Sequence, residues 1–177
     1  MGYRNDLWEI AAMRNGVVTL AEAEDAGVPA VEVRKLSSRG ALRSHGHGVY
    51  THCAIPPTWR TQPTVAVALA GNDAFLHRES VFHAMGLGQF NPPKIRVATP
   101  RRVRRTLPDW MELENRRDVP PEDLVEFEGI TVTTIQRALG DLRLWIPPDR
   151  WESLLHDAAR LELVTDSEAA QWQTERL

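Results

Sequence analysis

Apolar and polar positions in the first part of the chain follow the 3.6-residue period of amphipathic helices. This spacing predicts a helix over residues 3–14, where the apolar side chains share one face. Thr19 and Glu22 then stand at the spacing of a capping box, in which each side chain accepts a hydrogen bond from the other residue's main-chain amide. They predict a second, short helix that ends at Gly27.

A third helix and a hairpin follow directly. Proline favours the start of a helix and glycine its C-terminal end, so residues 29–39 are predicted to be helical and Gly40 to end the helix. The β-prone segments 41–44 and 49–52 flank four residues that include two glycines, which is typical of a hairpin. Helix, capped short helix, tight turn, helix and hairpin, in this order, predict a winged helix-turn-helix. The alternative is a small three-helix unit that binds no DNA, because the bare pattern is not specific.

The rest of the chain predicts a second domain, joined to the first by a stiff, proline-rich segment. The expected fold class is α+β, with a winged helix-turn-helix over residues 1–55 and a small mixed sheet packed with helices over residues 58–177. Strands are predicted near residues 75–77, 95–98, 112–114, 124–127 and 130–133, and helices near residues 62–69 and 79–85 and from residue 134 onward. A second capping box, Thr165 with Glu168, begins the last helix.

Composition agrees with a globular protein of the cytoplasm. Of the 177 residues, 42% are hydrophobic, and no run approaches the roughly 18 apolar residues that cross a bilayer, so no membrane partner is expected. The single cysteine, Cys53, excludes an internal disulfide and a thiolate metal cluster, as is usual in a reducing compartment. No cofactor is expected.

The net charge of −3 conceals a strong polarity along the chain. Residues 1–60 carry +1 and residues 61–105 carry +5, whereas residues 106–177 carry −9. A weakly basic front and a basic middle suit an anionic partner such as double-stranded DNA. The acidic remainder is most simply a solvated surface.

The outward face of the third helix supplies candidate base-reading residues. Val33 and Leu36 continue the apolar stripe of the first two helices and should face the core, which turns other positions outward. Arginine can donate two hydrogen bonds to guanine, small apolar groups contact the thymine methyl, and lysine or serine suit phosphates. The candidate DNA contacts are Ala30, Val31, Arg34, Lys35 and Ser38. The alternative is an ordinary solvated helix face.

Two more groups are candidate contacts to the DNA backbone. The predicted wing carries Arg43, His45 and His47. The densest basic run, expected in a loop after a strand, is Arg101, Arg102, Arg104 and Arg105. Because the front carries so little net charge, specific binding should need this run, or two copies of the protein on an inverted repeat. The run could instead engage a protein partner or balance the acidic rear.

Side chains suited to metal binding or hydrolysis are present but poorly arranged. Potential zinc ligands gather at the hairpin: His45, His47, His52 and Cys53. Flanking glycines fix them poorly and no second ligand pair is suitably spaced, so no metal site is predicted. His77 and His83 do not share a helical face, and Ser80 has no acidic partner at a motif spacing, which argues against a hydrolase triad.

A nuclease would need clustered carboxylates for magnesium and usually a lysine two residues after one of them. Neither of the two lysines, Lys35 and Lys94, follows an acidic residue at that spacing. One group of acidic residues lies in predicted helices and is more simply explained as a solvated face than as a metal site. It consists of Asp141, Asp149, Glu152 and Asp157. No catalytic residue and no enzyme activity are predicted.

Several short, distinct sequence segments, spread along nearly the whole chain, serve as landmarks for a comparison with known families. They are residues 16–19, residues 36–40 with Leu42, residues 48–50, residues 75–87, and residues 129–134 followed by Arg137, Leu139, Asp141 and Leu142. In these the sequence resembles the AbiEi family of antitoxins from type IV toxin–antitoxin systems. The resemblance implies a winged helix-turn-helix that represses its own operon, and a rear domain that antagonises a nucleotidyltransferase-like toxin encoded beside it.

These features predict an antitoxin and transcriptional autorepressor whose partners are double-stranded DNA, with inverted repeats in its own promoter, and a nucleotidyltransferase-like toxin. One alternative is a DNA-binding regulator with a ligand-sensing rear domain and no toxin partner. Another is a remnant of a winged-helix endonuclease fusion, since similar front halves occur fused to restriction-like endonuclease domains. An adjacent nucleotidyltransferase gene would distinguish the antitoxin from the ligand-sensing regulator.

Overall fold

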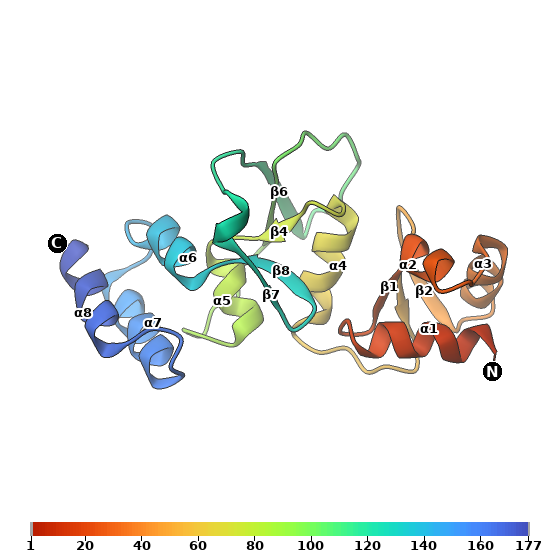
Figure 1. The fold of residues 1–177 in the computed structure, drawn as a ribbon, viewed down its shortest axis with the longest axis horizontal. Helices are drawn as coiled ribbons and strands as arrows, with labels where there is room; N and C mark the ends of the chain where they lie inside the picture. Colours follow the sequence, from red (N-terminus) through yellow and green to blue (C-terminus); the bar gives the residue numbers. More distant parts are fainter. Residues whose placement is uncertain (1, 177) are drawn as a thin grey trace.

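Two β-sheets follow one another along the long axis of the molecule. In the computed structural model, which describes residues 2–176, three helices and a three-stranded sheet form one end, a five-stranded sheet lies in the middle, and two helices form the other end (Figure 1). We call residues 2–52 the N-terminal unit and residues 61–176 the C-terminal unit. The predicted α+β class is confirmed. No helix within residues 2–176 has the length and apolar character needed to span a bilayer.

The N-terminal unit combines three helices with three antiparallel strands in the order β1-β3-β2. Its elements are α1 (Tyr3–Ala12), β1 (Val17–Thr19), α2 (Leu20–Asp25), α3 (Ala30–Ser38), β2 (Leu42–Gly46) and β3 (Val49–His52). The predicted helices and hairpin are confirmed. Strand β1 was not predicted, because three residues are too few for a recognisable alternation. They form a strand because Val17 pairs with Thr51 and Val18 with Tyr50.

Local chemistry fixes where the first helices begin and end. In the capping box of α2, Thr19 Oγ1 accepts a hydrogen bond from the amide of Glu22 (3.2 Å), and Glu22 Oε2 accepts one from the amide of Thr19 (2.8 Å). Pro29 is the N-cap residue of α3, so this helix begins one residue later than predicted. Gly40 has a φ of 77°, a left-handed conformation that glycine adopts readily, and it follows the end of α3 as predicted.

The C-terminal unit is built on a mixed sheet in the order β6-β5-β4-β8-β7. Its elements are α4 (Thr61–Ala70), β4 (Phe75–Leu76), α5 (Glu79–Met85), β5 (Ile95–Thr99), β6 (Met111–Asn115), the short 3-10 helix η1 (Pro121–Asp123), β7 (Leu124–Phe127), β8 (Ile130–Thr133), α6 (Ile135–Leu142), α7 (Pro148–Arg160) and α8 (Asp166–Glu175). The central pair β4 and β8 is parallel, as is β5 with β6, whereas β4 with β5 and β7 with β8 are antiparallel.

Helix α4 connects the two units through a shared core. Seven of its ten residues are buried, because it contacts β1 and β3 of the N-terminal unit as well as β5 and β8 of the C-terminal unit. Val17 and Val49 belong to the same buried cluster as Val65 and Leu69 of α4. The predicted joint at residues 56–57 is exposed, but apolar packing continues across it.

Polar contacts also hold the N-terminal unit against the C-terminal unit. The Asn15 side-chain amide donates hydrogen bonds to Thr64 Oγ1 (3.1 Å) and to the main-chain oxygen of Glu128 (2.9 Å). The Thr61 hydroxyl donates to the main-chain oxygen of Asn15 (3.0 Å). The turn after α1 is therefore tied both to α4 and to the β7–β8 turn, which fixes how the two units are oriented.

Candidate nucleic-acid interface

Helix α3 buries one side and presents the other to solvent. Val33 is buried and Leu36 packs against the N-terminal core, as the apolar stripe predicts. The side chains of Val31, Arg34, Lys35 and Ser38 are exposed, and Ala30 is half-buried. Lys35 Nζ lies 2.7 Å from Glu32 Oε1, and the Ser38 hydroxyl donates to the main-chain oxygen of Lys35 (2.9 Å). The candidate residues thus share one helical surface, of the kind that can enter a major groove.

Each of the two wing histidines has a hydrogen-bond partner within the chain, and Arg43 is exposed. His45 Nε2 lies 3.0 Å from Thr51 Oγ1, and the ring faces α4 across a cleft. Burial, and then the charge of Arg43, lower the pKa of His45, so its ring is neutral near pH 7. His47 Nε2 lies 3.1 Å from the main-chain oxygen of Thr106. Both rings therefore have intramolecular partners, and Arg43 and His47 are the predicted wing contacts that are exposed.

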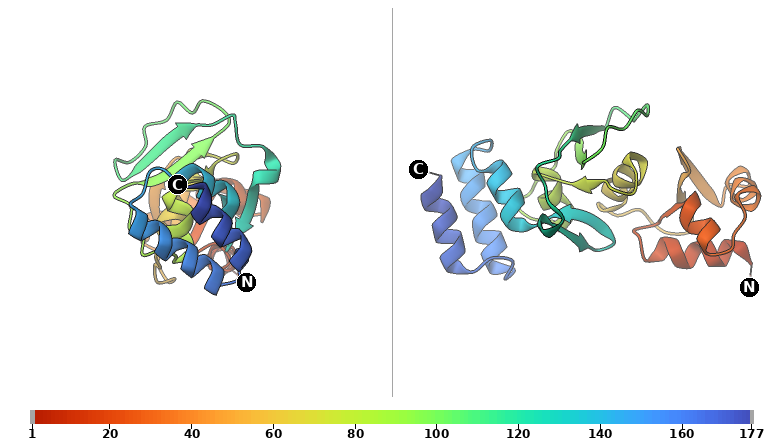
Figure 2. Two further views of the ribbon diagram at one scale, coloured as in Figure 1. Left: turned by 90° about the vertical axis from the view of Figure 1, so that its left-hand side faces the viewer. Right: turned by 45° about the horizontal axis from the view of Figure 1, so that its top comes forward.

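The loop of residues 100–110, between β5 and β6, reaches toward the N-terminal unit (Figure 2). It exposes all four predicted arginines, Arg101, Arg102, Arg104 and Arg105. Arg101 Nη2 lies 2.9 Å from Asp73 Oδ2, and Arg105 Nη1 donates to the main-chain oxygen of Leu69 (3.0 Å). These arginines line a hollow of about 330 Å³, and the contact of His47 with Thr106 joins this loop to the wing. The structure therefore places the basic run beside the wing.

The potential zinc ligands around the hairpin do not converge. His45 and His47 point to Thr51 and Thr106, as described above. The buried His52 instead accepts a hydrogen bond at Nδ1 from the amide of Ala54 (3.2 Å). Within residues 2–176, no group of three histidine, cysteine, aspartate or glutamate side chains lies close enough together to hold a metal ion.

The order of elements in the N-terminal unit, with α3 exposed and a hairpin behind it, is that of a winged helix-turn-helix. Residues 5–51 match the family model described as a transcriptional regulator, the AbiEi antitoxin. The resemblance expected from the sequence is confirmed over this AbiEi-type stretch, which runs from α1 into β3 and contains α3 and most of the wing. No curated protein matches the chain.

The C-terminal unit lies outside the matched AbiEi stretch, and its landmark residues have clear structural roles. Gly129 has a φ of 76°, and a Cβ atom there would lie 3.0 Å from the main-chain oxygen of Met13, so glycine lets the turn approach the N-terminal unit without strain. Thr134 caps α6 by accepting a hydrogen bond from the amide of Arg137 (3.3 Å). Of these landmark residues, Gly129 lies at the contact between the two units and Thr134 begins α6.

An ion-pair cluster between the segment after β6, η1 and α6 was missed by sequence reasoning. The Arg116 side chain, 8% exposed, reaches Asp141 (2.5 Å) and Asp118 (2.6 Å), and Arg137 contacts Asp118, Asp123 and Asp141. The hydrogen bond between Arg116 and Asp118 raises the pKa of the guanidinium and holds that of the carboxyl well below its usual range. The expectation that Asp141 belongs to a solvated face is wrong, because Arg116 covers it. The spacing of Arg137 and Asp141, four residues apart, was the one local signal.

Proposed function

We propose that this protein binds inverted repeats in its own promoter and represses its own transcription. The observation that carries the proposal is the exposed side of α3, with Arg34 and Lys35 at its centre, in a unit that matches the AbiEi regulator family. In this arrangement α3 enters the major groove, where Arg34 donates to guanine and Val31 contacts a thymine methyl. Lys35, once released from Glu32, and Ser38 bind phosphates.

The arginine loop supplies the positive charge that the N-terminal unit lacks. Residues 1–60 carry a net charge of only +1, and phosphate contacts dominate the affinity of most DNA-binding proteins. The loop is joined to the wing through His47 and Thr106, so its arginines can contact the backbone beside Arg43. A second copy of the protein on the other half-site adds the remaining affinity.

Binding to the promoter is tested by measuring the affinity of full-length variants for promoter DNA and for unrelated duplexes. Arg34→Ala should lower affinity for the operator by about 1 to 3 kcal/mol and relax its sequence preference, whereas Lys35→Ala should weaken binding to all duplexes similarly. Arg160→Ala, on the exposed part of α7 far along the chain, is the matched control. An operator affinity for the double variant of Arg34 and Lys35 equal to that of the parent would refute the assignment.

The proposed antitoxin activity is antagonism of a nucleotidyltransferase-like toxin encoded beside this protein, carried by the C-terminal unit. The AbiEi match supports a regulator and antitoxin role, and residues 106–177, with a net charge of −9, can serve a different partner from the DNA. Co-expression of the toxin with the full-length double variant of Arg34 and Lys35 tests this division. The variant should fail to repress the promoter but still rescue growth; loss of rescue together with loss of DNA binding would contradict it.

A further inference from the structure

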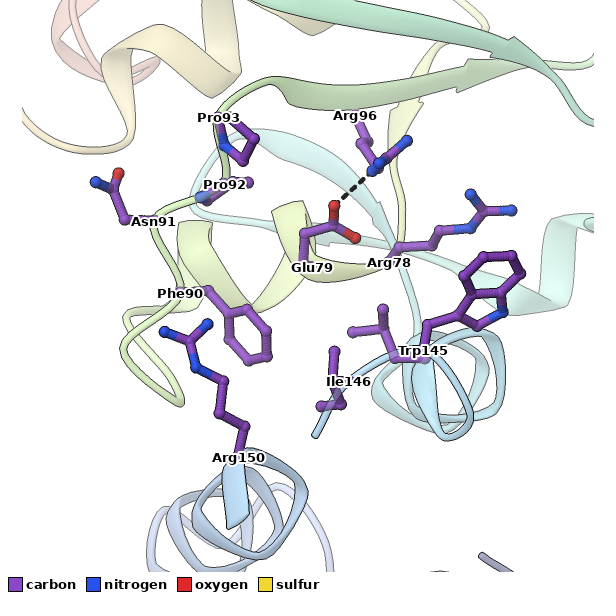
Figure 3. A pocket seen from close by; sticks show the side chains of 11 residues that line it. Arg78, Glu79, Phe90, Asn91, Pro92, Pro93, Arg96, Trp145, Ile146 and Arg150 are labelled. Carbon is purple, nitrogen blue, oxygen red and sulfur yellow. Dashed lines mark hydrogen bonds and ion pairs between the residues drawn. The ribbon is translucent and has the colours of Figure 1, made fainter. Parts of the chain in front are cut away.

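A pocket of about 300 Å³ opens in the C-terminal unit, between the start of α5, the segment before β5 and the connection from α6 to α7 (Figure 3). Its apolar wall includes Phe90, Pro92 and Ile146. Figure 3 shows Arg78 and Trp145 on one side of the pocket and Phe90 and Arg150 on the other. The pocket shares no residue with α3, the wing or the arginine loop, so what it binds is independent of the proposed DNA interface.

The side chains that line the pocket carry a net positive charge. Three arginines and one glutamate line it. Arg96 is neutralised, because its guanidinium bonds to Glu79 (2.5 Å) and Glu112 (2.9 Å). The guanidinium of Arg150 lies over the Phe90 ring, 5.8 Å from the ring centroid, and is exposed. Arg150 is thus positioned to receive an anionic group.

Arg78 is held at the pocket by an unfavourable backbone conformation. Its φ of 53° and ψ of −137° lie in a region that residues with a Cβ atom rarely adopt, directly before the first residue of α5. Its Nη1 lies 3.4 Å from Glu114 Oε2, and its buried Nε has no hydrogen-bond partner among residues 2–176. A strained position that carries a long cationic side chain with an unsatisfied donor is typical of a binding site.

Trp145 leaves a large aromatic surface uncovered next to Arg78. Its side chain is 78% exposed, and the Arg78 guanidinium carbon lies 5.9 Å from the centroid of its ring. An exposed indole beside an apolar wall offers a stacking surface for a planar ring.

We propose that this pocket binds a small molecule that joins a planar ring to an anionic group. The ring packs against Trp145 and the apolar wall, and the anionic group meets Arg150 on the opposite side. The volume is at the lower end of the range for small-molecule sites and suits a ligand of this size. Nucleoside monophosphates and aromatic carboxylates both have this chemistry.

Calorimetric titration of the full-length protein tests the proposal with two ligand families. The probes are the four common nucleoside monophosphates and a series of aromatic carboxylates such as salicylate, with inorganic phosphate and adenosine as probes that carry only one of the two groups. Members of at least one family should bind, at least tenfold more tightly than inorganic phosphate or adenosine. The family that binds identifies the source of the ligand.

Two variants and a matched control locate the binding. Arg150→Gln and Trp145→Ala change exposed side chains, so the fold should persist, and each should weaken the best probe at least tenfold. Arg160→Gln lies on the same helix outside the pocket and should bind as the parent does. Absence of binding by every probe, or unchanged affinity in both pocket variants, would overturn the proposal. Operator binding by the same samples reports separately on the DNA interface.

Discussion

The ring of His47, at the tip of the wing, contacts the main-chain oxygen of Thr106 across 59 residues of sequence. His47 itself has a φ of 50°, a left-handed conformation that positions the ring at the turn between β2 and β3. This contact joins the N-terminal unit to the arginine loop. The wing is therefore supported by the C-terminal unit.

Loosening this contact should mobilise the arginine loop. His47→Asn keeps a residue that tolerates the left-handed conformation but shortens the side chain, so the bond to Thr106 is lost. Amide hydrogen exchange over residues 100–110 should become faster, while exchange in α3 stays unchanged. Arg43→Gln, an exposed neighbour on β2, provides the control. Unchanged exchange in the loop would show that the contact does not restrain it.

Removing the four arginines of the loop should weaken operator binding in a salt-dependent manner. Arg101, Arg102, Arg104 and Arg105 are all exposed, so replacing them with alanine removes charge with little effect on folding. Operator affinity should fall at low salt, by an amount that shrinks as salt rises, with sequence preference retained. Binding titrations over a range of salt concentrations measure this. Unchanged affinity at low salt with lost toxin neutralisation would assign the loop to the protein partner.

A fragment that ends at Pro57 should be less stable than the same residues in the full chain. Val17 and Val49 are buried in the core that includes α4, so the truncation exposes them to water. Thermal unfolding of residues 1–57 should occur at a lower temperature, or with lower cooperativity, than loss of α1 to α3 in the intact protein. Operator preference should persist at low temperature, more weakly. Equal stability would show that α4 contributes nothing to the N-terminal unit.

Breaking the pair of Arg116 and Asp141 should destabilise the C-terminal unit. Asp141→Asn removes one carboxylate partner of the Arg116 guanidinium, whose side chain is only 8% exposed. This loss should lower the free energy of unfolding by about 3 kcal/mol. Asp123→Asn, which removes a more exposed partner of Arg137, should cost about 1 kcal/mol or less. Urea denaturation of the two variants compares them directly. Similar losses in both would show that burial of Arg116 does not set the cost.

Stability should decline as the pH falls below about 6.5 because of His77, which is 1% exposed. Burial, and then the charges of Arg78 and Arg116, lower the pKa of His77 to about 3. Because this pKa is lower in the folded chain than in the unfolded one, the neutral ring stabilises the fold above pH 6.5. That contribution is lost as the pH falls from about 6.5 toward 3, by at most about 1.4 kcal/mol per pH unit.

The variant His77→Asn isolates this contribution from the other histidines. Its unfolding free energy, measured in urea between pH 7 and pH 5, should depend less steeply on pH than that of the parent. Carboxylates titrate mainly below this range, so they contribute little to the comparison. Parallel pH profiles for parent and variant would contradict the role given to His77.

Local interactions account for what the sequence determined by itself. The capping box of Thr19 and Glu22, the helix end at Gly40 and the division of α3 between Val33 and Arg34 depend on residues within four positions of each other. Such contacts form in any environment that allows the helix, so spacing along the chain is enough to predict them. The same holds for the hairpin, whose two strands adjoin one short turn.

Long-range packing decided the rest. Strand β1 exists because β3 pairs with it. His47 has a partner because the loop after β5 brings Thr106 to it, and Asp141 is covered because the segment after β6 brings Arg116 to α6. The pocket of Trp145 and Arg150 likewise depends on how α6 and α7 pack beside α5. The hydrophobic period along one segment records which face is buried but not which distant segment covers it. Only the tertiary structure could therefore bring these residues together.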